Sequence, residues 1–205
     1  MSDFISIYTN TPNPKHILDT VKVLENGGVI IFPTDTVYGL GCLSNNLKAL
    51  DRFATIKGVK LEQAPLSFLF EDIRSLSNYV APMNSQTFKF VKRLLPGPYA
   101  LIMHTAHKLH KPFQKRKTIG VRISDHPLLQ ELLKLLSAPL ITSSLHDPDE
   151  ILDYTSDPEN LFQQWESQID LMLSDGYGNN IPSTVLDLTT EPFEVIREGV
   201  GEIPF

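Results

Sequence analysis

The sequence predicts a layered α/β (α+β) domain with a mixed β-sheet, and three observations lead to that fold class. Segments with a strand pattern alternate with segments with a helix pattern along most of the chain. Near the C-terminus three strand-like segments follow one another without a helix, so part of the sheet is predicted to be antiparallel. Hydroxyl-bearing residues and glycines gather where several predicted strands end, and ligands of open α/β sheets bind at such ends.

Each predicted helix has apolar residues at helical spacing and a start or stop signal. Gly27 and Gly28 end the first helix, and Pro127 and Pro158 suit the first turns of the last two. The predicted helices cover residues 17–25, 46–56, 85–95, 126–137 and 157–167.

The predicted strands are short apolar runs bounded by turn residues. Thr36 and Tyr38 follow the first of them, and Ser144 follows a later one. Gly39 and Gly41 are interpreted as turn residues. The predicted strands cover residues 29–32, 66–70, 100–104, 118–123, 140–143, 171–174, 184–188 and 193–197.

Composition indicates one globular domain over residues 1–205, because 41% of the residues are hydrophobic and 20% are charged. The single cysteine, Cys42, excludes an internal disulfide, favours a reducing compartment and is interpreted as a small core residue in a buried turn. The sequence has no signal-peptide pattern and no apolar run of membrane-spanning length. We therefore expect a cytoplasmic protein without a membrane contact.

Charge is distributed in blocks along the chain. Residues 89–122 contain nine Lys or Arg and no Asp or Glu, whereas residues 147–175 contain nine Asp or Glu and no Lys or Arg. Such blocks are typical of solvated faces, and a positive rim over an anionic ligand is the alternative. The net charge of −6 argues against a protein that mainly coats nucleic acid.

Several motifs, in order along nearly the whole chain, resemble those of the YrdC-domain family, whose studied members are threonylcarbamoyl-AMP synthases. They are PTDTVYGLG from Pro33, Lys57-Gly58 in place of Lys-x-Arg, PGPYALIM from Pro96, TIGVRI from Thr118, PLITSS from Pro139, PSTVLDLT from Pro182 and VIREGVG from Val195. The stretch KRKTIGVR and a missing asparagine make the chain most similar to the YciO branch. Unlike longer members, the chain is expected to carry no second domain after the YrdC-like region.

The resemblance implies a twisted mixed sheet with helices on both faces and a large concave pocket. It also implies a reaction in which L-threonine, bicarbonate and ATP give threonylcarbamoyl-AMP and pyrophosphate, for modification of adenosine 37 of certain tRNAs. ATP with Mg²⁺ would then be a substrate, and we expect no tightly bound cofactor. Such chemistry depends mainly on placement and on charge stabilisation.

The threonine-binding residues implied by the resemblance are Thr36, Tyr38, Arg122, Thr142 and Ser183. Thr36 would contact the substrate, with Tyr38 shaping the turn; a hydrogen-bonded turn threonine is the alternative. Arg122 would clamp the substrate carboxylate, although an arginine on an apolar strand also fits a structural salt bridge. Ser183 would hold threonine.

The nucleotide- and phosphate-binding residues implied by the resemblance are Lys57, Lys60, Thr118, Ser143, Ser144 and Arg197. For Arg197 a strand-end ion pair is the alternative. Val59 replaces the family arginine and Leu145 replaces the family asparagine, and both changes fall on the nucleotide part of the site. Lys60 is the expected substitute for the arginine, although lysine is not a bidentate guanidinium.

Other combinations of polar residues carry weaker predictions. His104, His107 and His110 recur every three residues, but no acid lies near them in sequence and we expect no metal site. His146 and Asp147 are interpreted as surface-loop residues.

Two alternatives to the synthase function stay open. One is a YciO-type enzyme with altered activity on threonylcarbamoyl-AMP or another adenylate. The other is a module that binds double-stranded RNA or tRNA, with a weak contact through the basic region Lys108–Lys117.

Overall fold

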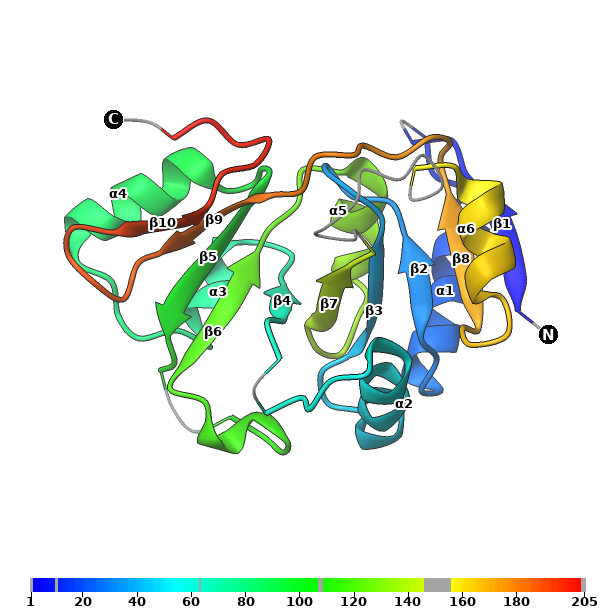
Figure 1. The fold of residues 1–205 in the computed structure, drawn as a ribbon, viewed down its shortest axis with the longest axis horizontal. Helices are drawn as coiled ribbons and strands as arrows, with labels where there is room; N and C mark the ends of the chain where they lie inside the picture. Colours follow the sequence, from blue (N-terminus) through cyan, green and yellow to red (C-terminus); the bar gives the residue numbers. More distant parts are fainter. Residues whose placement is uncertain (1, 10, 63, 107–108, 146–155, 204–205) are drawn as a thin grey trace.

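The computed structural model describes residues 2–9, 11–62, 64–106, 109–145 and 156–203. Within these residues ten strands form one sheet, in the order β1-β8-β2-β3-β7-β4-β6-β5-β9-β10 (Figure 1). The strands are β1 (Asp3–Ser6), β2 (Ile30–Phe32), β3 (Gly39–Leu43), β4 (Ser67–Leu69), β5 (Tyr99–His104), β6 (Thr118–Arg122), β7 (Leu140–Ser144), β8 (Leu171–Ser174), β9 (Thr184–Asp187) and β10 (Glu194–Arg197). The helices are α1 (Pro14–Glu25), α2 (Leu47–Lys57), α3 (Ile73–Ser77), α4 (Ser85–Leu94), the 3₁₀ helix η1 (Phe113–Lys115), α5 (Pro127–Leu133) and α6 (Pro158–Trp165).

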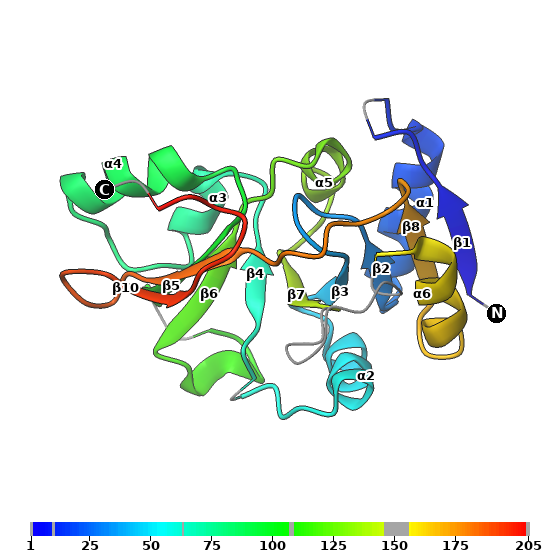
Figure 2. The same ribbon diagram turned by 45° about the horizontal axis from the view of Figure 1, so that its top comes forward.

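The sheet is mixed, as the sequence predicts. The pairs β1–β8, β2–β8, β4–β6 and β5–β9 are parallel, and the other neighbours are antiparallel. Of the last three strands, β9 and β10 pair with each other, whereas β8 lies in the other half of the sheet beside β1 and β2. The segment between β8 and β9 therefore crosses from one half of the molecule to the other (Figures 1 and 2).

Helices cover both faces of the half that contains β2, β3 and β8. On one face, α1 and α5 contribute Leu24 and Leu129 to a cluster that includes Ile30 of β2. On the opposite face, α2 and α6 contribute Phe53 and Leu161 to a second cluster (Figure 1). No helix of the described residues is long and apolar enough to cross a membrane.

In the half that contains β5 and β6, the helices of the described residues fill one face. Ile119 and Val121 of β6 belong to the same buried cluster as Leu76 of α3 and Val91 of α4. Side chains alternate along a strand, so Thr118, Gly120 and Arg122 face the other way. That second face is the wall of a cavity.

The segment after β2 differs from the prediction, because Gly39, Gly41 and Cys42 form the central strand β3 and not a turn. β3 pairs with both β2 and β7. A Cβ atom on Gly41 would lie 2.8 Å from the ring of Phe32 and 2.8 Å from the carbonyl oxygen of Ile141. The two glycines thus make room for an aromatic ring that packs over the strand.

The remaining differences are short elements and helix ends. The helix predicted over 126–137 ends at Leu133, and β1, α3 and η1 were not predicted from the sequence. These elements have three to five residues, too few for a periodic apolar pattern to stand out.

Candidate anion-binding cavity

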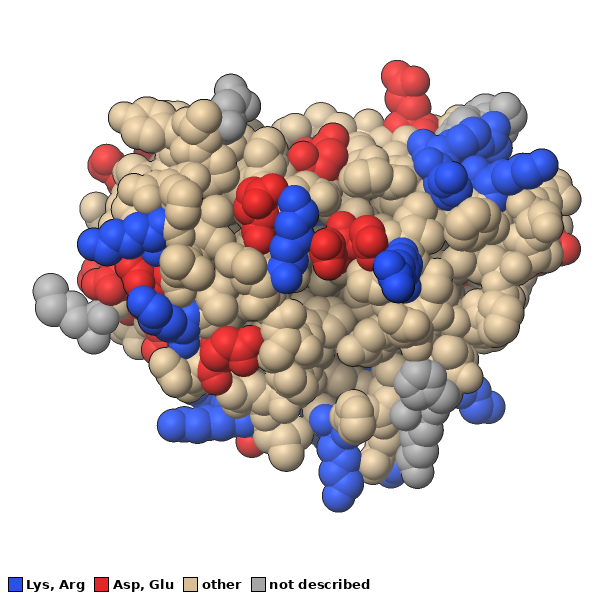
Figure 3. All heavy atoms as spheres, turned by 180° about the vertical axis from the view of Figure 1, so that it is seen from behind, with Lys and Arg blue, Asp and Glu red and all other residues tan. Residues whose placement is uncertain are grey.

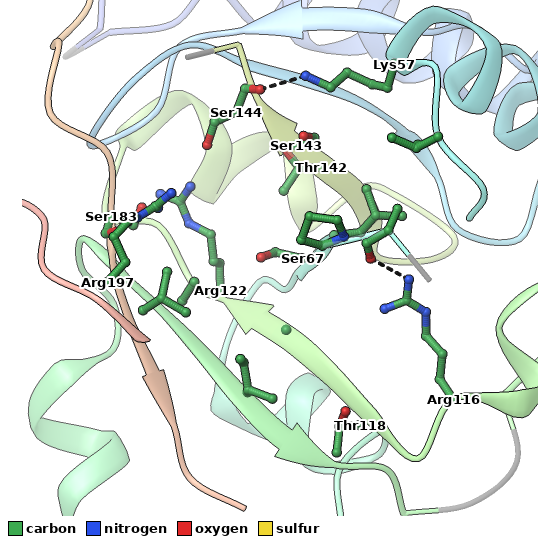
Figure 4. A pocket seen from close by; sticks show the side chains of 18 residues that line it. Lys57, Ser67, Arg116, Thr118, Arg122, Thr142, Ser143, Ser144, Ser183 and Arg197 are labelled. Atoms are coloured by element: carbon green, nitrogen blue, oxygen red, sulfur yellow. Dashed lines mark hydrogen bonds between the residues drawn. The ribbon is translucent and has the colours of Figure 1, made fainter. Parts of the chain in front are cut away.

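A cavity of about 520 Å³ lies between the two halves of the sheet, on the face of β6 that carries Thr118, Gly120 and Arg122 (Figure 4). Its walls come from β4, β5, β6, β7, β9 and β10 and from the end of α2. The described residues that line it are Lys57, Val59, Ala64, Pro65, Leu66, Ser67, Ala100, Ile102, Arg116, Thr118, Gly120, Arg122, Thr142, Ser143, Ser144, Ser183, Val185 and Arg197.

The lining of this cavity is strongly cationic. Among the described residues that form it, Lys57, Arg116, Arg122 and Arg197 are basic and none is acidic. Arg122 and Arg197 lie next to each other beside Ser183, while Lys57 and Arg116 lie on the opposite side (Figure 4). Hydroxyl groups of serines and threonines lie between the two pairs. Such a cavity favours a ligand with negative charge and several hydrogen-bond acceptors.

Three hydroxyl groups meet at the Arg122 end. Thr36 Oγ1 lies 3.2 Å from Ser183 Oγ and 3.2 Å from Thr34 Oγ1. Thr34 Oγ1 also donates to the carbonyl oxygen of Val37 at 2.7 Å and accepts from the Thr36 amide at 3.0 Å, which fixes the turn. Thr36 is only 2% exposed and lies behind the cavity wall, where it contacts two lining residues without being one itself.

Arg122 forms the buried salt bridge that was the structural alternative for this residue, and it also lines the cavity. Its Nη2 donates to Asp35 Oδ1 at 2.9 Å and to Thr36 Oγ1 at 3.3 Å, and the Arg122 and Asp35 side chains are 7% and 5% exposed. Asp35 Oδ1 also accepts from Ser124 Oγ at 2.7 Å. Burial lowers the pKa of Arg122, and the adjacent Asp35 carboxylate opposes that effect. Arg122 is thus held by a buried ion pair while it still lines the cavity.

Arg197 reaches the same end of the cavity from the edge strand β10. Its Nε and Nη2 donate to the carbonyl oxygen of Ser183 at 3.1 and 2.8 Å. No acidic side chain among the described residues forms an ion pair with Arg197. Burial, and then the positive charge of Arg122, lower its pKa. Arg122 and Arg197 are neighbours and only Arg122 is paired with a carboxylate, that of Asp35, so the pair leaves a net positive charge for a ligand.

Lys57 and the serines of β7 lie at the opposite end. Gly58, with φ of 63°, ends α2 and leaves Lys57 as its last residue. Lys57 Nζ donates to the carbonyl oxygen of Ser144 at 3.1 Å, and burial lowers the pKa of this lysine. Ser143, Ser144 and Thr142 line the cavity beside it.

The two departures from the family motifs have different structural outcomes. Val59 lines the cavity, so an apolar side chain stands two residues after Lys57. Leu145 is 7% exposed and packs in the main hydrophobic cluster, while its amide donates to the carbonyl oxygen of Tyr38 at 3.0 Å. Neither side chain offers a polar group to the cavity.

Besides Thr36, two more of the residues expected in the site do not line the cavity. Tyr38 is 1% exposed, and its hydroxyl donates to the carbonyl oxygen of Gly176 at 2.6 Å. That bond ties the turn after β2 to the segment after β8, so Tyr38 shapes the turn from the core. Burial raises the pKa of Tyr38 to about 12. Lys60 is exposed and does not line the cavity.

Other residues of the site were not assigned an individual role from sequence, although Arg116 lies in the basic region expected to form a positive rim or to contact RNA. Ser67 lines the cavity, and Asp35 and Ser124 hold Arg122 from behind it. Asp35 stands within the PTDT motif, but its burial against Arg122, which is 87 positions away in sequence, depends on long-range folding. Arg116 lines the cavity although its neighbours Lys115 and Lys117 are exposed.

The basic block of residues 89–122 therefore divides into two parts. Arg116 and Arg122 line the cavity, whereas Lys92 and Arg93 are exposed on α4. Figure 3 shows a group of basic side chains at the end of the rear face that carries α4, and mixed charges elsewhere on that face. Lys111, like Lys115 and Lys117, is exposed, and Lys108 lies outside the described residues, so RNA contact through this region stays a prediction.

The weaker combinations gain no support as a site. His104 and His110 are exposed, and His107, His146 and Asp147 lie outside the described residues. Among the residues that the structure describes, no group of three or more His, Cys, Asp or Glu is placed to hold a metal ion.

The fold and the cavity define a mixed α/β protein with a cationic, hydroxyl-rich binding site. A family model covering Sua5, YciO and YrdC, described as telomere recombination, matches residues 22–199. The chain belongs to this Sua5/YciO/YrdC family.

Individual relatives show the same relationship. Escherichia coli K12 YciO, named an uncharacterized protein, is 34% identical over 209 residues that cover 100% of both chains. Its crystal structure has a TM-score of 0.88 at 35% identity, covering 98% of each chain. A threonylcarbamoyl-AMP synthase of Vibrio vulnificus YJ016 is 30% identical over 188 residues, covering 90% of this chain and 98% of the relative.

A more distant solved structure shares the fold. Sua5 of P. abyssi, complexed with L-threonine, has a TM-score of 0.84 at 22% identity, covering 97% of this chain and 58% of that chain. The predicted resemblance to the YrdC-domain family and to YciO is confirmed.

Proposed function

We propose that the cavity binds L-threonine and ATP, and that the protein forms threonylcarbamoyl-AMP from these and bicarbonate for tRNA modification. The observation that carries this proposal is the lining of the cavity, with four basic side chains, several hydroxyl groups and no acid among its described residues. The similarity to a threonylcarbamoyl-AMP synthase and the L-threonine complex of Sua5 support the choice of ligands.

The threonine end would be the end that contains Arg122. The Arg122 guanidinium would bind the substrate carboxylate with its cavity-facing edge, since one of its nitrogens is already held by Asp35 and Thr36. Ser183 would contact the amino acid from the wall, with Thr36 behind it. Thr142 lines the cavity between this end and the serines.

The nucleotide end would use Lys57, Thr118, Ser143 and Ser144, which all line the cavity. Arg197 stands at the threonine end beside Arg122, where it would reach the nucleotide portion nearest the acyl group. The described lining has no carboxylate for a resident Mg²⁺. Magnesium would therefore enter on the triphosphate, as part of the substrate.

The proposed chemistry balances without a redox partner. The threonine amine and bicarbonate give a carbamate and water. A carbamate oxygen then bonds to the α-phosphorus of ATP while the bond from that phosphorus to the bridging oxygen breaks, and pyrophosphate leaves with the negative charge. The protein would hold the two reactants in line and stabilise the developing charge with its basic side chains.

The test is pyrophosphate release by the purified protein supplied with ATP, Mg²⁺, L-threonine and bicarbonate. We expect release that needs all four components and that is lost in Arg122→Met. Release that does not depend on threonine, or no release at all, would reject the synthase function.

A second candidate is a YciO-type enzyme that acts on preformed threonylcarbamoyl-AMP or another acyl adenylate. Val59 in the lining and Leu145 in the core favour it, because neither side chain offers the polar group that binding of a triphosphate would use. An enzyme of this kind would consume added threonylcarbamoyl-AMP while failing to release pyrophosphate from ATP. Measuring pyrophosphate release from ATP together with consumption of added threonylcarbamoyl-AMP therefore separates the two candidates.

A further inference from the structure

Arg116 is a fixed cation in the cavity wall. Its Nη2 donates to the carbonyl oxygens of Leu61 and Ala64, both at 2.6 Å, and its guanidinium lies 5.7 Å from the ring centre of Phe113. These contacts hold the guanidinium in one place while it lines the cavity (Figure 4). A cation fixed before the ligand arrives loses little side-chain entropy on binding.

The charge of Arg116 lacks an acidic partner within the described part of the chain. None of the ion pairs there includes it, and its Nε is buried without a hydrogen-bond partner. Burial lowers the pKa of Arg116, and the exposed Glu62 only partly opposes this effect. Burying a cation is costly unless an anion compensates, and the cavity is where an anion has access.

The loop that Arg116 holds supplies no cation of its own to the lining. Between Lys57 and Ser67 this loop lines the cavity with Val59, Ala64, Pro65 and Leu66, whereas Lys60 is exposed and does not line it. Arg116 thus adds a positive charge to this wall from a different segment, on the same side of the cavity as Lys57 (Figure 4).

We propose that Arg116 and Lys57 form a phosphate-binding end of the cavity that holds the pyrophosphate portion of the ligand, opposite the Arg122 end. Arg116 supplies this end with the guanidinium that the loop after α2 does not carry. The identity of the ligand rests on the proposed function, whereas the binding of a polyphosphate at this end is testable by itself.

The test is the affinity of the full chain for inorganic pyrophosphate with Mg²⁺, measured by titration calorimetry for the wild type, Arg116→Gln and Lys117→Gln. Lys117 is the matched control, because it is adjacent in sequence, exposed and absent from the lining. We expect Arg116→Gln to weaken binding about tenfold or more, which is the effect of losing a charge-assisted contact. Lys117→Gln should stay within about twofold of the wild type, because exposed charges are screened.

Two results would overturn the inference: no pyrophosphate binding by the wild type, or equal losses in the two variants. Should Arg116→Gln not fold, because the loop contacts are lost, Arg116→Lys decides the matter. Lysine keeps the charge but lacks the planar fork, so we expect binding weakened about threefold or more, and affinity equal to the wild type would contradict the role.

The outcome is independent of the synthase assay. If pyrophosphate binding depends on Arg116 but the protein has no synthase activity, the proposed synthase function is rejected and the proposed phosphate-binding end is supported. If the wild type has synthase activity but Arg116→Gln binds pyrophosphate with unchanged affinity, the synthase function is supported and the role of Arg116 is rejected.

Discussion

The buried ion pair between Arg122 and Asp35 gives a prediction that separates folding from binding. In the variant Arg122→Met, the Asp35 carboxylate keeps the Ser124 hydroxyl and loses its charged partner. Removing one member of a buried ion pair costs about 3–5 kcal/mol. For a chain of this size that loss lowers the melting temperature by about 6–20 °C.

The double variant Arg122→Met with Asp35→Asn leaves no unpaired charge. The asparagine oxygen still accepts from Ser124, so we expect a free energy of unfolding within about 1–2 kcal/mol of the wild type. Threonine binding should nevertheless stay at least about tenfold weaker than in the wild type, because the guanidinium that would bind the carboxylate is gone.

The assays are urea unfolding for stability and titration calorimetry with L-threonine for binding, on the wild type, both single variants and the double variant. Wild-type threonine affinity in the double variant would show that Arg122 is only structural. A single Arg122→Met variant as stable as the wild type would refute the energetic role of the ion pair.

Three further predictions concern packing and pH. Gly41→Ala should destabilise the protein by about 1–3 kcal/mol in urea unfolding, because its Cβ would lie 2.8 Å from the Phe32 ring; an unchanged midpoint would contradict this packing. Burial lowers the pKa of Lys57, so pyrophosphate affinity should fall as pH rises through a value below the ordinary lysine range, and Lys57→Arg should remove that fall. Burial acts to raise the pKa of Asp175, but hydrogen bonds led by the one from His126 outweigh it and hold the pKa below the ordinary value. The stabilisation from this lowered pKa is present above the ordinary aspartate range and is lost as pH falls through the lowered value. Asp175→Asn should therefore make the free energy of unfolding depend less on pH at the acid end. Acid unfolding identical to that of the wild type would refute the effect.

The fold class was predictable because most strands and helices have a clear apolar period and turn residues at their ends. The central strand β3 was not, since Gly39 and Gly41 are turn residues in most sequence contexts. The glycines are explained by close neighbours from other segments, namely the ring of Phe32 at both positions and the carbonyl oxygen of Ile141 at Gly41. The place of β8 beside β1 and β2 also depends on contacts between distant segments.

Many residues of the candidate site could be predicted from the sequence, but the contacts between them could not. Motifs indicated Arg122 and Ser183, and the structure brings both to one cavity. The pairing of Asp35 with Arg122 and the inward direction of Arg116 follow from tertiary packing, and no local pattern in the sequence distinguishes Arg116 from its exposed neighbours.

A crystal structure with L-threonine and a non-hydrolysable ATP analogue would test the central claim most directly. We predict the threonine carboxylate on Arg122 and the phosphate chain between Lys57 and Arg116, inside the cavity of Figure 4. Ligands bound outside this cavity, or a cavity that stays without them at saturating concentrations, would contradict it.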